Sequence, residues 1–247
     1  MSAVKAIYRI PAVRTREQYA ERLRERLSEP ETSIFWDEER RGSVWNKWRI
    51  WNSYRDHPGV SHVCMLDDDA DVVNNFKPIA ETAMAQFPDA IMTFCHCNAN
   101  PVRMREKPHG TPYLRLTNYD LRGISVALPV KYIDGFMSWW EEWLAKNPKT
   151  RNRDDTALKM YACVKRIPVI VTIPNLVRPL DIPSAIHPWC KSRESDLWVG
   201  YDVDAKQFEV DWYGERKSKR LFDFHLPETE PVVQYVTAEY KKQLMLR

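Results

Sequence analysis

The sequence predicts an α/β protein with a mainly parallel central sheet and helices on both faces. Short apolar runs alternate with segments whose apolar residues have helical spacing, and strands that alternate with helices build sheets of this kind. Only 7 of the 247 residues are glycine, which argues against a loop-built β protein. A chain of this length suits one α/β domain with a substantial core.

The first half of the chain supplies most of the parallel sheet. Strands are expected at 4–10, 32–36, 61–66 and 90–94, and helices at 15–27, from Ser43 onward, and at 74–87. Ser43 stands where an N-cap is expected, and Val44, Trp48 and Trp51 follow at the spacing of one helix face.

The second half predicts a small mixed β region and two more helices. Strands at 113–117 and 123–128 leave no room for a helix between them. An amphipathic helix carries Phe136, Trp140 and Trp143, and a second covers 154–164 before a strand at 169–172. The Pro-rich segment 174–188 is expected to be a loop, and 232–246 a closing helix. We expect one catalytic domain over 1–205, with a C-terminal extension over 206–247 packed on it.

Composition limits the function classes. The formal net charge of +3 is too small to require a nucleic-acid partner, but clustered basic residues bind phosphate locally. Five cysteines without a spaced framework predict free thiols in a reducing compartment. No segment approaches the roughly 20 apolar residues that cross a bilayer, so we expect a cytoplasmic protein with no membrane partner. The basic clusters are Arg14, Arg16, Arg22, Arg24 and Arg26; Arg103, Arg105 and Lys107; and Arg216, Lys217, Lys219 and Arg220.

The strongest local signal is an apolar strand that runs directly into Asp67, Asp68 and Asp69. Adjacent carboxylates repel one another and need cations when buried, and ligands of open α/β sheets gather beyond the carboxyl ends of the strands. Asp67 and Asp69 can aim at one point while Asp68 faces elsewhere, and such oxygen ligands suit Mn²⁺ or Mg²⁺. The alternative is a solvated turn in which Asp69 or Asp71 caps the next helix.

A second pair of carboxylates, Asp154 and Asp155, opens the helix at 154–164. The positive end of the helix dipole favours an ionised carboxylate there. The pair can be an N-cap followed by a first-turn acid. Alternatively, Asp155 is a general base that removes a proton from an acceptor hydroxyl.

Four blocks of the sequence, within residues 4–188, resemble the nucleotide-sugar glycosyltransferases of the A-type (GT-A) fold, especially small phage-encoded members. The resemblance implies a Rossmann-related sheet, a nucleotide-sugar donor with UDP-sugars favoured, and Mn²⁺ or Mg²⁺ as the metal. The blocks are the strand ending at Ile10-Pro11, the stretch from Phe35-Trp36-Asp37 through Gly42 into the Trp-rich helix, the strand ending in Asp67-Asp68-Asp69, and Arg153-Asp154-Asp155-Thr156 followed by Ile173-Pro174-Asn175-Leu176-Val177.

The resemblance also implies roles for individual residues. Arg9, Ile10 and Pro11 would line the nucleotide pocket, and Asp37 would contact the base or ribose. Asp67 and Asp69 would occupy the family's Asp-x-Asp (DXD) positions, with Asp68 beside them in the donor site. Asp69 would be the direct metal ligand, and Asp67 would lie nearer the ribose or a metal-bound water.

The resemblance also implies a catalytic base and a third metal ligand, and this sequence matches only the first of these positions directly. Asp155, with Asp154 beside it, would be the catalytic base of an inverting reaction, or would position donor or acceptor in a retaining one. A late histidine often completes the metal site, and in close relatives we expect it near Pro179. This chain has Arg178 there, and His187 is the available substitute.

Phage relatives of this type add sugars to hydroxymethylated pyrimidines in DNA, which implies a DNA acceptor in the host cytoplasm. Such an enzyme must flip the base out of the duplex, and basic and aromatic side chains suit a backbone-tracking groove with stacking positions. The candidate acceptor-binding residues are Trp189, Lys191, Trp198 and Trp212.

Other readings stay open. The acceptor can instead be a surface glycan or a small molecule. A nucleotidyltransferase also uses paired aspartates, but it usually has a Gly-rich phosphate loop near the first strand, and residues 10–13 contain no glycine. A non-enzymatic DNA-binding protein leaves the three aspartates unexplained.

Overall fold

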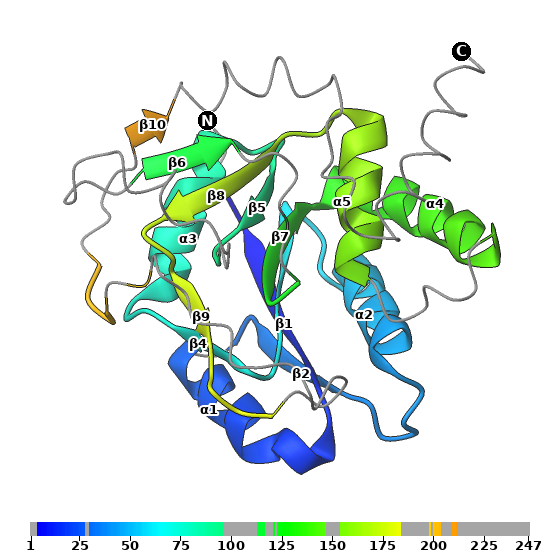
Figure 1. Cartoon of the computed structure of the whole chain (residues 1–247), viewed down its shortest axis with the longest axis horizontal. Coiled ribbons are helices and arrows are strands. Elements are labelled where there is room, and N and C mark those ends of the chain that lie inside the picture. The colour runs from blue at the N-terminus through cyan, green and yellow to red at the C-terminus, as the bar shows by residue number, and fades with distance from the viewer. Residues whose placement is uncertain are drawn as a thin grey trace, which may run out of the picture.

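A central eight-stranded sheet organises the computed structural model (Figure 1). The structure describes residues 4–27, 30–95, 113–116, 121, 123–146, 154–183, 198, 200–203 and 209–211. The strand order is β10-β6-β8-β5-β7-β3-β1-β2. The strands are β1 (Ala6–Ala12), β2 (Thr32–Trp36), β3 (His62–Leu66), β5 (Ile91–Thr93), β6 (Tyr113–Leu116), β7 (Ser125–Pro129), β8 (Val169–Ile173) and β10 (Glu209–Asp211).

Most of this sheet is parallel, as the sequence predicts. β1, β2, β3, β5 and β8 run in one direction, and β6, β7 and β10 run in the other. The antiparallel strands belong to the second half of the chain, where a mixed β region is expected. β10 lies in the predicted C-terminal extension and pairs with β6.

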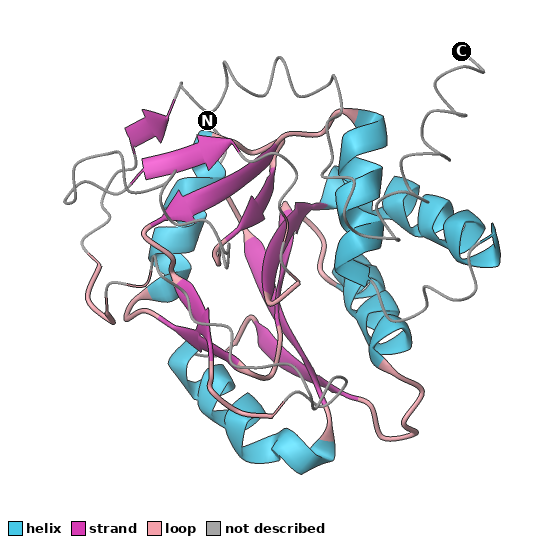
Figure 2. Cartoon of the chain, in the orientation of Figure 1, coloured by secondary structure: helices cyan, strands magenta, loops and turns pink. Residues whose placement is uncertain are grey.

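Helices cover both faces of the sheet (Figure 2). Alternate residues of the central strands point to opposite sides, so Tyr8 and Leu66 lie on one face and Ile7 and Met65 on the other. On the first face they pack with α1 (Glu17–Leu27) and α3 (Phe76–Gln86). On the second they pack with α2 (Ser43–Asn52), α4 (Ile133–Lys146) and α5 (Asp154–Lys165). The predicted fold class is confirmed.

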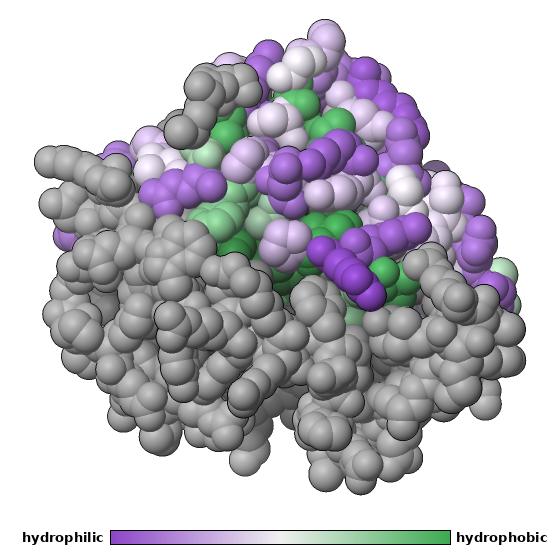
Figure 3. Space-filling model, turned by 90° about the horizontal axis from the view of Figure 1, so that it is seen from above, coloured by the Kyte–Doolittle hydropathy of each residue, from purple (hydrophilic) through white to green (hydrophobic). Residues whose placement is uncertain are grey.

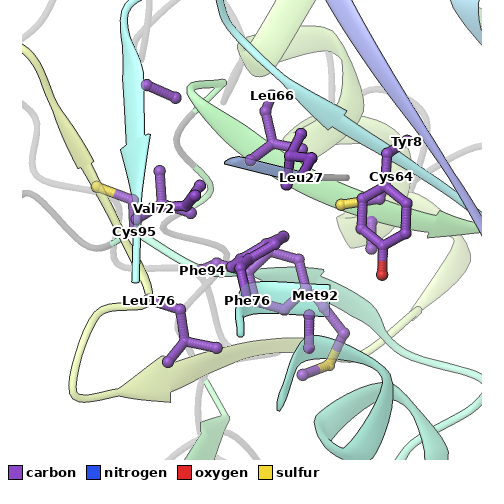
Figure 4. Packing of buried hydrophobic residues seen from close by; sticks show 14 of the residues in the cluster. Tyr8, Leu27, Cys64, Leu66, Val72, Phe76, Met92, Phe94, Cys95 and Leu176 are labelled. Carbon is purple, nitrogen blue, oxygen red and sulfur yellow. The ribbon is translucent and has the colours of Figure 1, made fainter. Parts of the chain in front are cut away.

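The core on the first face is dense and aromatic (Figure 4). The ring of Phe76 makes edge contacts with those of Phe94 and Tyr8, at centroid distances of 5.2 and 6.2 Å. Cys64 and Cys95 are fully buried free thiols in the same cluster. Fully burying a large apolar side chain contributes about 1.5–3 kcal/mol, so this packing is a main source of the sheet's stability.

The edge strand β2 is protected by the helix that follows it. The Asn46 side-chain amide donates to the carbonyl of Phe35 at 2.6 Å, and Arg49 donates to the carbonyl of Trp36 at 3.0 Å. Satisfied carbonyls make an edge strand a poorer template for pairing with another chain. The N-cap of α2 is Gly42 rather than the expected Ser43, and no side chain hydrogen-bonds as a cap there.

Two short strands were not expected from the sequence. β4 (Ala70–Val72) pairs antiparallel with β9 (Val177–Pro179), so the segment 174–188 is not loop throughout. The strands form because residues far apart in sequence meet, and three residues are too few to show periodicity. α3 begins after Asn75, so neither Asp69 nor Asp71 caps it, contrary to the solvated-turn alternative.

The described surface is mixed in character. Figure 3 shows small apolar areas between larger polar ones on the face seen from above. Among the helices that the structure describes, none has the length and apolar character needed to span a bilayer.

Candidate functional site

The carboxyl ends of β1 and β3 lie side by side, and the chain leaves them in opposite directions. From β1 it passes through η1 (Arg14–Arg16) and α1 to β2 at the edge of the sheet. From β3 it passes through β4 and α3 to β5, on the far side of β7. Open α/β sheets bind ligands where neighbouring strands diverge in this way, so a binding crevice is expected at this point. Residues 13–16 follow β1 here, and the three aspartates follow β3.

The turn that carries the aspartates is fixed through its main chain. The amide of Asp67 donates to the carbonyl of Ile124 at 2.9 Å, and the amide of Ala70 donates to the carbonyl of Asp67 at 2.9 Å. The amide of Leu180 donates to the carbonyl of Asp69 at 2.7 Å. The segments before β7 and after β9 therefore hold the turn from two sides.

Asp68 forms a buried ion pair with Arg16. Arg16 Nη1 lies 2.8 Å from Asp68 Oδ1 and 3.4 Å from Asp69 Oδ2, and Arg16 Nη2 donates to the carbonyl of Pro183. The side chains of Arg16 and Asp68 are only 9% and 10% exposed. Burial raises the pKa of Asp68, while the hydrogen bond and charge of Arg16 oppose that rise. Asp68 is thus bound to the protein rather than presented to the crevice.

Asp67 and Asp69 are more accessible than Asp68. Their side chains are 29% and 27% exposed, although the Oδ1 atom of Asp67 is itself buried. Lys47 of α2 places its Nζ atom 3.1 Å from Asp67 Oδ1, and its own side chain is only 7% exposed. Two buried cations, Arg16 and Lys47, therefore accompany three carboxylates.

Three of the predicted donor-binding residues lie inside β1. The strand extends to Ala12, beyond the predicted end at Ile10, so Ile10 is fully buried in the core and Pro11 is also buried. Arg9 is 2% exposed, and burial lowers its pKa to about 10. Its guanidinium donates to the Ser53 hydroxyl at 3.0 Å and the Glu31 carbonyl at 2.9 Å, which ties β1 to neighbouring segments.

Asp37 follows β2 directly, at the predicted position. Its two carboxylate oxygens accept hydrogen bonds from the amides of Arg41 and Gly42, each at 2.8 Å, and the residue is buried. This arrangement fixes the loop that enters α2, and it therefore also fixes the start of the helix that carries Lys47.

Asp154 and Asp155 open α5, as predicted. The three residues between α5 and β8 turn the chain back, so α5 begins on the side of the sheet where β8 ends. The carboxylate of Asp155 is half-buried and accepts from the amide of Thr156 at 2.7 Å. The predicted catalytic base thus lies toward the same end of the sheet as the aspartate turn.

Of the other predicted residues, His187, Trp189, Lys191 and Trp212 lie outside the described part of the chain. Trp198 is half-buried, and the guanidinium of Arg178 lies 5.0 Å from its ring centroid.

Arg178, near the position where a histidine metal ligand was expected from the resemblance, belongs to a second ion-pair network. Its Nη2 lies 3.0 Å from Asp71 Oδ2, and the Tyr201 hydroxyl donates to the same oxygen at 2.7 Å. Asp71 is 2% exposed and faces Arg178 across the β4–β9 pair. The network joins the segment around Tyr201 to the sheet.

Arg16 and Lys47 were not among the residues predicted for the site. Arg16 was noted only as part of a basic cluster, and Lys47 lies within the Trp-rich helix. The available signal was position, because each follows a strand, β1 or β2, whose carboxyl end lies at the same end of the sheet as the aspartate turn.

In the described ranges, no group of three or more His, Cys, Asp or Glu side chains is arranged to hold a metal ion. Any metal that binds Asp67 and Asp69 would need further ligands from its surroundings, such as a bound phosphate or water.

The chain matches no family model and no curated protein. Its structure is similar to that of a glycosyltransferase involved in the glycosylation of the major capsid of PBCV-1, with 16% identity and a TM-score of 0.43 over 68% of this chain and 81% of that one. It is also similar to the apo form of the glycosyltransferase GlyE of Streptococcus pneumoniae TIGR4, with 11% identity and a TM-score of 0.37 over 79% of this chain and 58% of that one. At these values the likeness is partial and assigns neither a substrate nor a residue.

Proposed function

We propose that the protein is a glycosyltransferase that moves a sugar from a nucleotide-diphosphate-sugar to an acceptor hydroxyl. One observation carries the proposal: the accessible carboxylates Asp67 and Asp69 lie at the crevice between β1 and β3, next to two buried cations. Carboxylates and cations at such a crevice suit a bound diphosphate and the metal that accompanies it. UDP-sugars are the favoured donors.

A divalent cation fits the donor set of this site. Asp67 and Asp69 offer carboxylate oxygens, which Mn²⁺ and Mg²⁺ prefer, and both are partly exposed. Three carboxylates and two cations leave a net charge of −1, so the site retains attraction for a cation. Asp69 would be the direct ligand, and Asp67 would lie nearer the ribose or a metal-bound water. When bound, the metal would offset charge on the leaving diphosphate.

Glycosyl transfer also needs a base and a pocket that excludes water and orients the two substrates. Asp155, at the start of α5, would remove the proton from the acceptor hydroxyl in an inverting reaction, or would position the substrates in a retaining one. Arg16 and Asp68 would keep the aspartate turn in one geometry, because their buried pair restricts it.

We propose a 5-hydroxymethylpyrimidine in DNA as the acceptor. Its support is the clustered basic and aromatic residues of the sequence, which suit phosphate contacts and base stacking. A surface glycan or a small molecule is the alternative acceptor. A DNA-binding protein without enzymatic activity is the alternative function.

A thermal-shift experiment tests the donor site. The purified protein is heated with UDP, GDP, CMP or ADP, each with and without Mn²⁺. Ligand at a hundredfold excess over its dissociation constant stabilises by about 2.7 kcal/mol, or about 5–10 °C for a domain of this size. We expect one nucleotide to give a metal-dependent shift that Asp69→Asn abolishes. Asp89→Asn, which changes an exposed aspartate before β5, is the matched control and should retain the shift.

The outcomes separate the two functions. If a folded protein binds DNA and no nucleotide shifts its melting temperature, the transferase proposal fails and the DNA-binding alternative takes its place. Once a donor is found, mass spectrometry of hydroxymethylated and unmodified duplexes tests the acceptor. A gain of one sugar mass on the hydroxymethylated duplex alone supports DNA as the acceptor, and no gain on either overturns it.

A further inference from the structure

Asp71 is the most deeply buried carboxylate among the described residues, and the proposed chemistry does not use it. The residue is 2% exposed. Its Oδ2 atom accepts hydrogen bonds from Nη2 of Arg178 at 3.0 Å and from the hydroxyl of Tyr201 at 2.7 Å. Its Oδ1 atom accepts from the amide of Val72 at 3.1 Å. A buried carboxylate is costly unless charged partners and hydrogen-bond donors surround it, and these contacts supply both.

The β4–β9 pair connects Asp71 to the aspartate turn. Asp71 and Arg178 face each other at the centre of the pair. Hydrogen-bonded residue pairs alternate along antiparallel strands, so the next one lies two residues away on each strand. There the amide of Leu180 donates to the carbonyl of Asp69 at 2.7 Å. The position of Asp69 therefore depends on how β9 lies against β4.

The strand pair is too short to fix its own geometry. Each strand has only three residues, and an isolated two-stranded pair is marginally stable. Asp71 adds the side-chain contact to Arg178 across the pair and the contact to Tyr201 from a third segment. Arg26 of α1 lies 3.6 Å from Asp71 Oδ1 and also donates to the carbonyl of Val72. Four segments thus meet at this one carboxylate.

We propose that Asp71 is a positioning residue for the donor site, because it holds β9 against β4 and so fixes Asp69. The inference rests on the proposed function, in which Asp69 binds the metal that accompanies the nucleotide. The side chain of Asp69 is 27% exposed, and its contact with Arg16 is a long one of 3.4 Å. Its carboxylate therefore keeps one direction only if its main chain is held. A displacement of about 1 Å is enough to weaken a site of this kind severely.

Amide exchange at Leu180 tests the structural step without any ligand. In Asp71→Asn the charge at the centre of the network is lost while the shape of the side chain is kept. We expect the Leu180 amide, which donates to Asp69, to exchange about tenfold faster in this variant. Asp134→Asn is the matched control, because Asp134 also accepts from a tyrosine hydroxyl and an arginine but lies exposed at the start of α4. An unchanged exchange rate in Asp71→Asn would overturn the proposal.

The affinity for nucleotide tests the functional step. UDP, or the nucleotide that the thermal-shift screen selects, is titrated by calorimetry at one Mn²⁺ concentration and well below the melting temperatures. We expect Asp71→Asn to bind about tenfold more weakly than the wild type. Ile133→Val controls for a general loss of stability, because Ile133 is fully buried on the second face of the sheet. This control should lower the melting temperature and keep both the wild-type affinity and the wild-type exchange rate of Leu180.

A milder variant keeps the test valid if Asp71→Asn does not fold. Tyr201→Phe removes one hydrogen bond to the carboxylate and no charge, so we expect smaller changes of the same sign in both measurements. Wild-type affinity in a folded Asp71→Asn, or wild-type exchange and affinity in Tyr201→Phe when the first variant does not fold, would refute the positioning role. An equal loss of affinity in Ile133→Val would refute it too. A wild type that binds no nucleotide overturns the proposed function instead, and exchange at Leu180 then still decides whether Asp71 fixes the turn.

Discussion

Replacing Arg16 with Met removes the cation that neutralises Asp68 and keeps a side chain of similar length. In the native protein Arg16 Nη1 is 2.8 Å from Asp68 Oδ1, and both side chains are about nine-tenths buried. The variant therefore leaves a carboxylate inside the protein without its main charge partner. Asp69 loses its longer contact with the same nitrogen, at 3.4 Å.

The expected cost follows from the burial of this pair. Removing one partner of a buried ion pair costs about 3–5 kcal/mol, because the remaining charge stays desolvated. For a domain of this size each kcal/mol lowers the melting temperature by about 2–4 °C, so we expect a drop of about 6–20 °C. By contrast, Arg14→Met breaks a pair with Glu38 whose side chains are about half exposed, and it should change stability little.

The loss of stability in the Arg16→Met variant should also depend on pH. Burial already raises the pKa of Asp68, and loss of Arg16 raises it further. A carboxyl group whose folded pKa exceeds its unfolded pKa binds protons more tightly in the native state, so stability falls as pH rises between these two values. The destabilisation of Arg16→Met should therefore be full at neutral pH and shrink on acidification.

Urea unfolding followed by tryptophan fluorescence measures these effects. The double variant with Asp68→Asn should recover much of the lost stability and lose its pH dependence, because no buried charge remains. If Arg16→Met unfolds at the wild-type urea concentration, or if Asp68→Asn fails to rescue it, the buried-charge explanation is wrong.

The remaining predictions concern the core, a buried histidine and the second ion-pair network. Trp140→Ala removes a fully buried ring that stacks on Phe136 at 5.2 Å, and it should cost about 3–5 kcal/mol in urea unfolding. An unchanged unfolding midpoint would contradict that packing. Burial lowers the pKa of His62 to about 4, so the unfolded chain binds more protons between pH 4 and 6.5, and stability should fall as pH drops through this window. The His62→Gln variant should lose stability less steeply over this pH range. An identical dependence of stability on pH in the two proteins would count against the lowered pKa of His62. Asp71→Asn should cost about 1–3 kcal/mol and speed amide exchange at residues 200–203, whereas unchanged exchange would show that Asp71 does not anchor this segment.

The large elements of the fold could be predicted because their patterns are local. The strand at 32–36 has the predicted bounds, and the Trp-rich and 154–165 helices begin within a residue of the expected position. β4 and β9 escaped prediction because their formation depends on pairs such as Asp71 with Arg178, which lie 107 residues apart. A three-residue strand containing Pro179 has no periodicity to detect, and Pro argues against a strand.

The site was only partly predictable, for a related reason. The aspartates could be found because they follow an apolar strand, and the end of a strand fixes their place in the fold. Arg9, Ile10 and Pro11 were expected to line the nucleotide pocket at the end of the first strand, but β1 continues to Ala12 because β2 pairs with it up to Trp36. Arg16 and Lys47 are charged residues of helical segments, and such residues normally face solvent. Their burial depends on tertiary contact with the aspartate turn.

The charged groups at the crevice contrast with the other buried charges of the protein. Arg9 is held by hydrogen bonds to fixed protein groups, and the carboxylate of Asp71 is closed off by Arg178 and Tyr201. At the crevice, by comparison, Asp67 and Asp69 keep more than a quarter of their side-chain surface exposed. Buried ion pairs are often no better for stability than apolar residues of the same volume, so stability alone does not account for this cluster. Charged groups that the protein holds on one side and leaves partly exposed on the other are suited to binding a charged ligand. A nucleotide diphosphate with its metal carries charges of both signs, which complement those of this cluster.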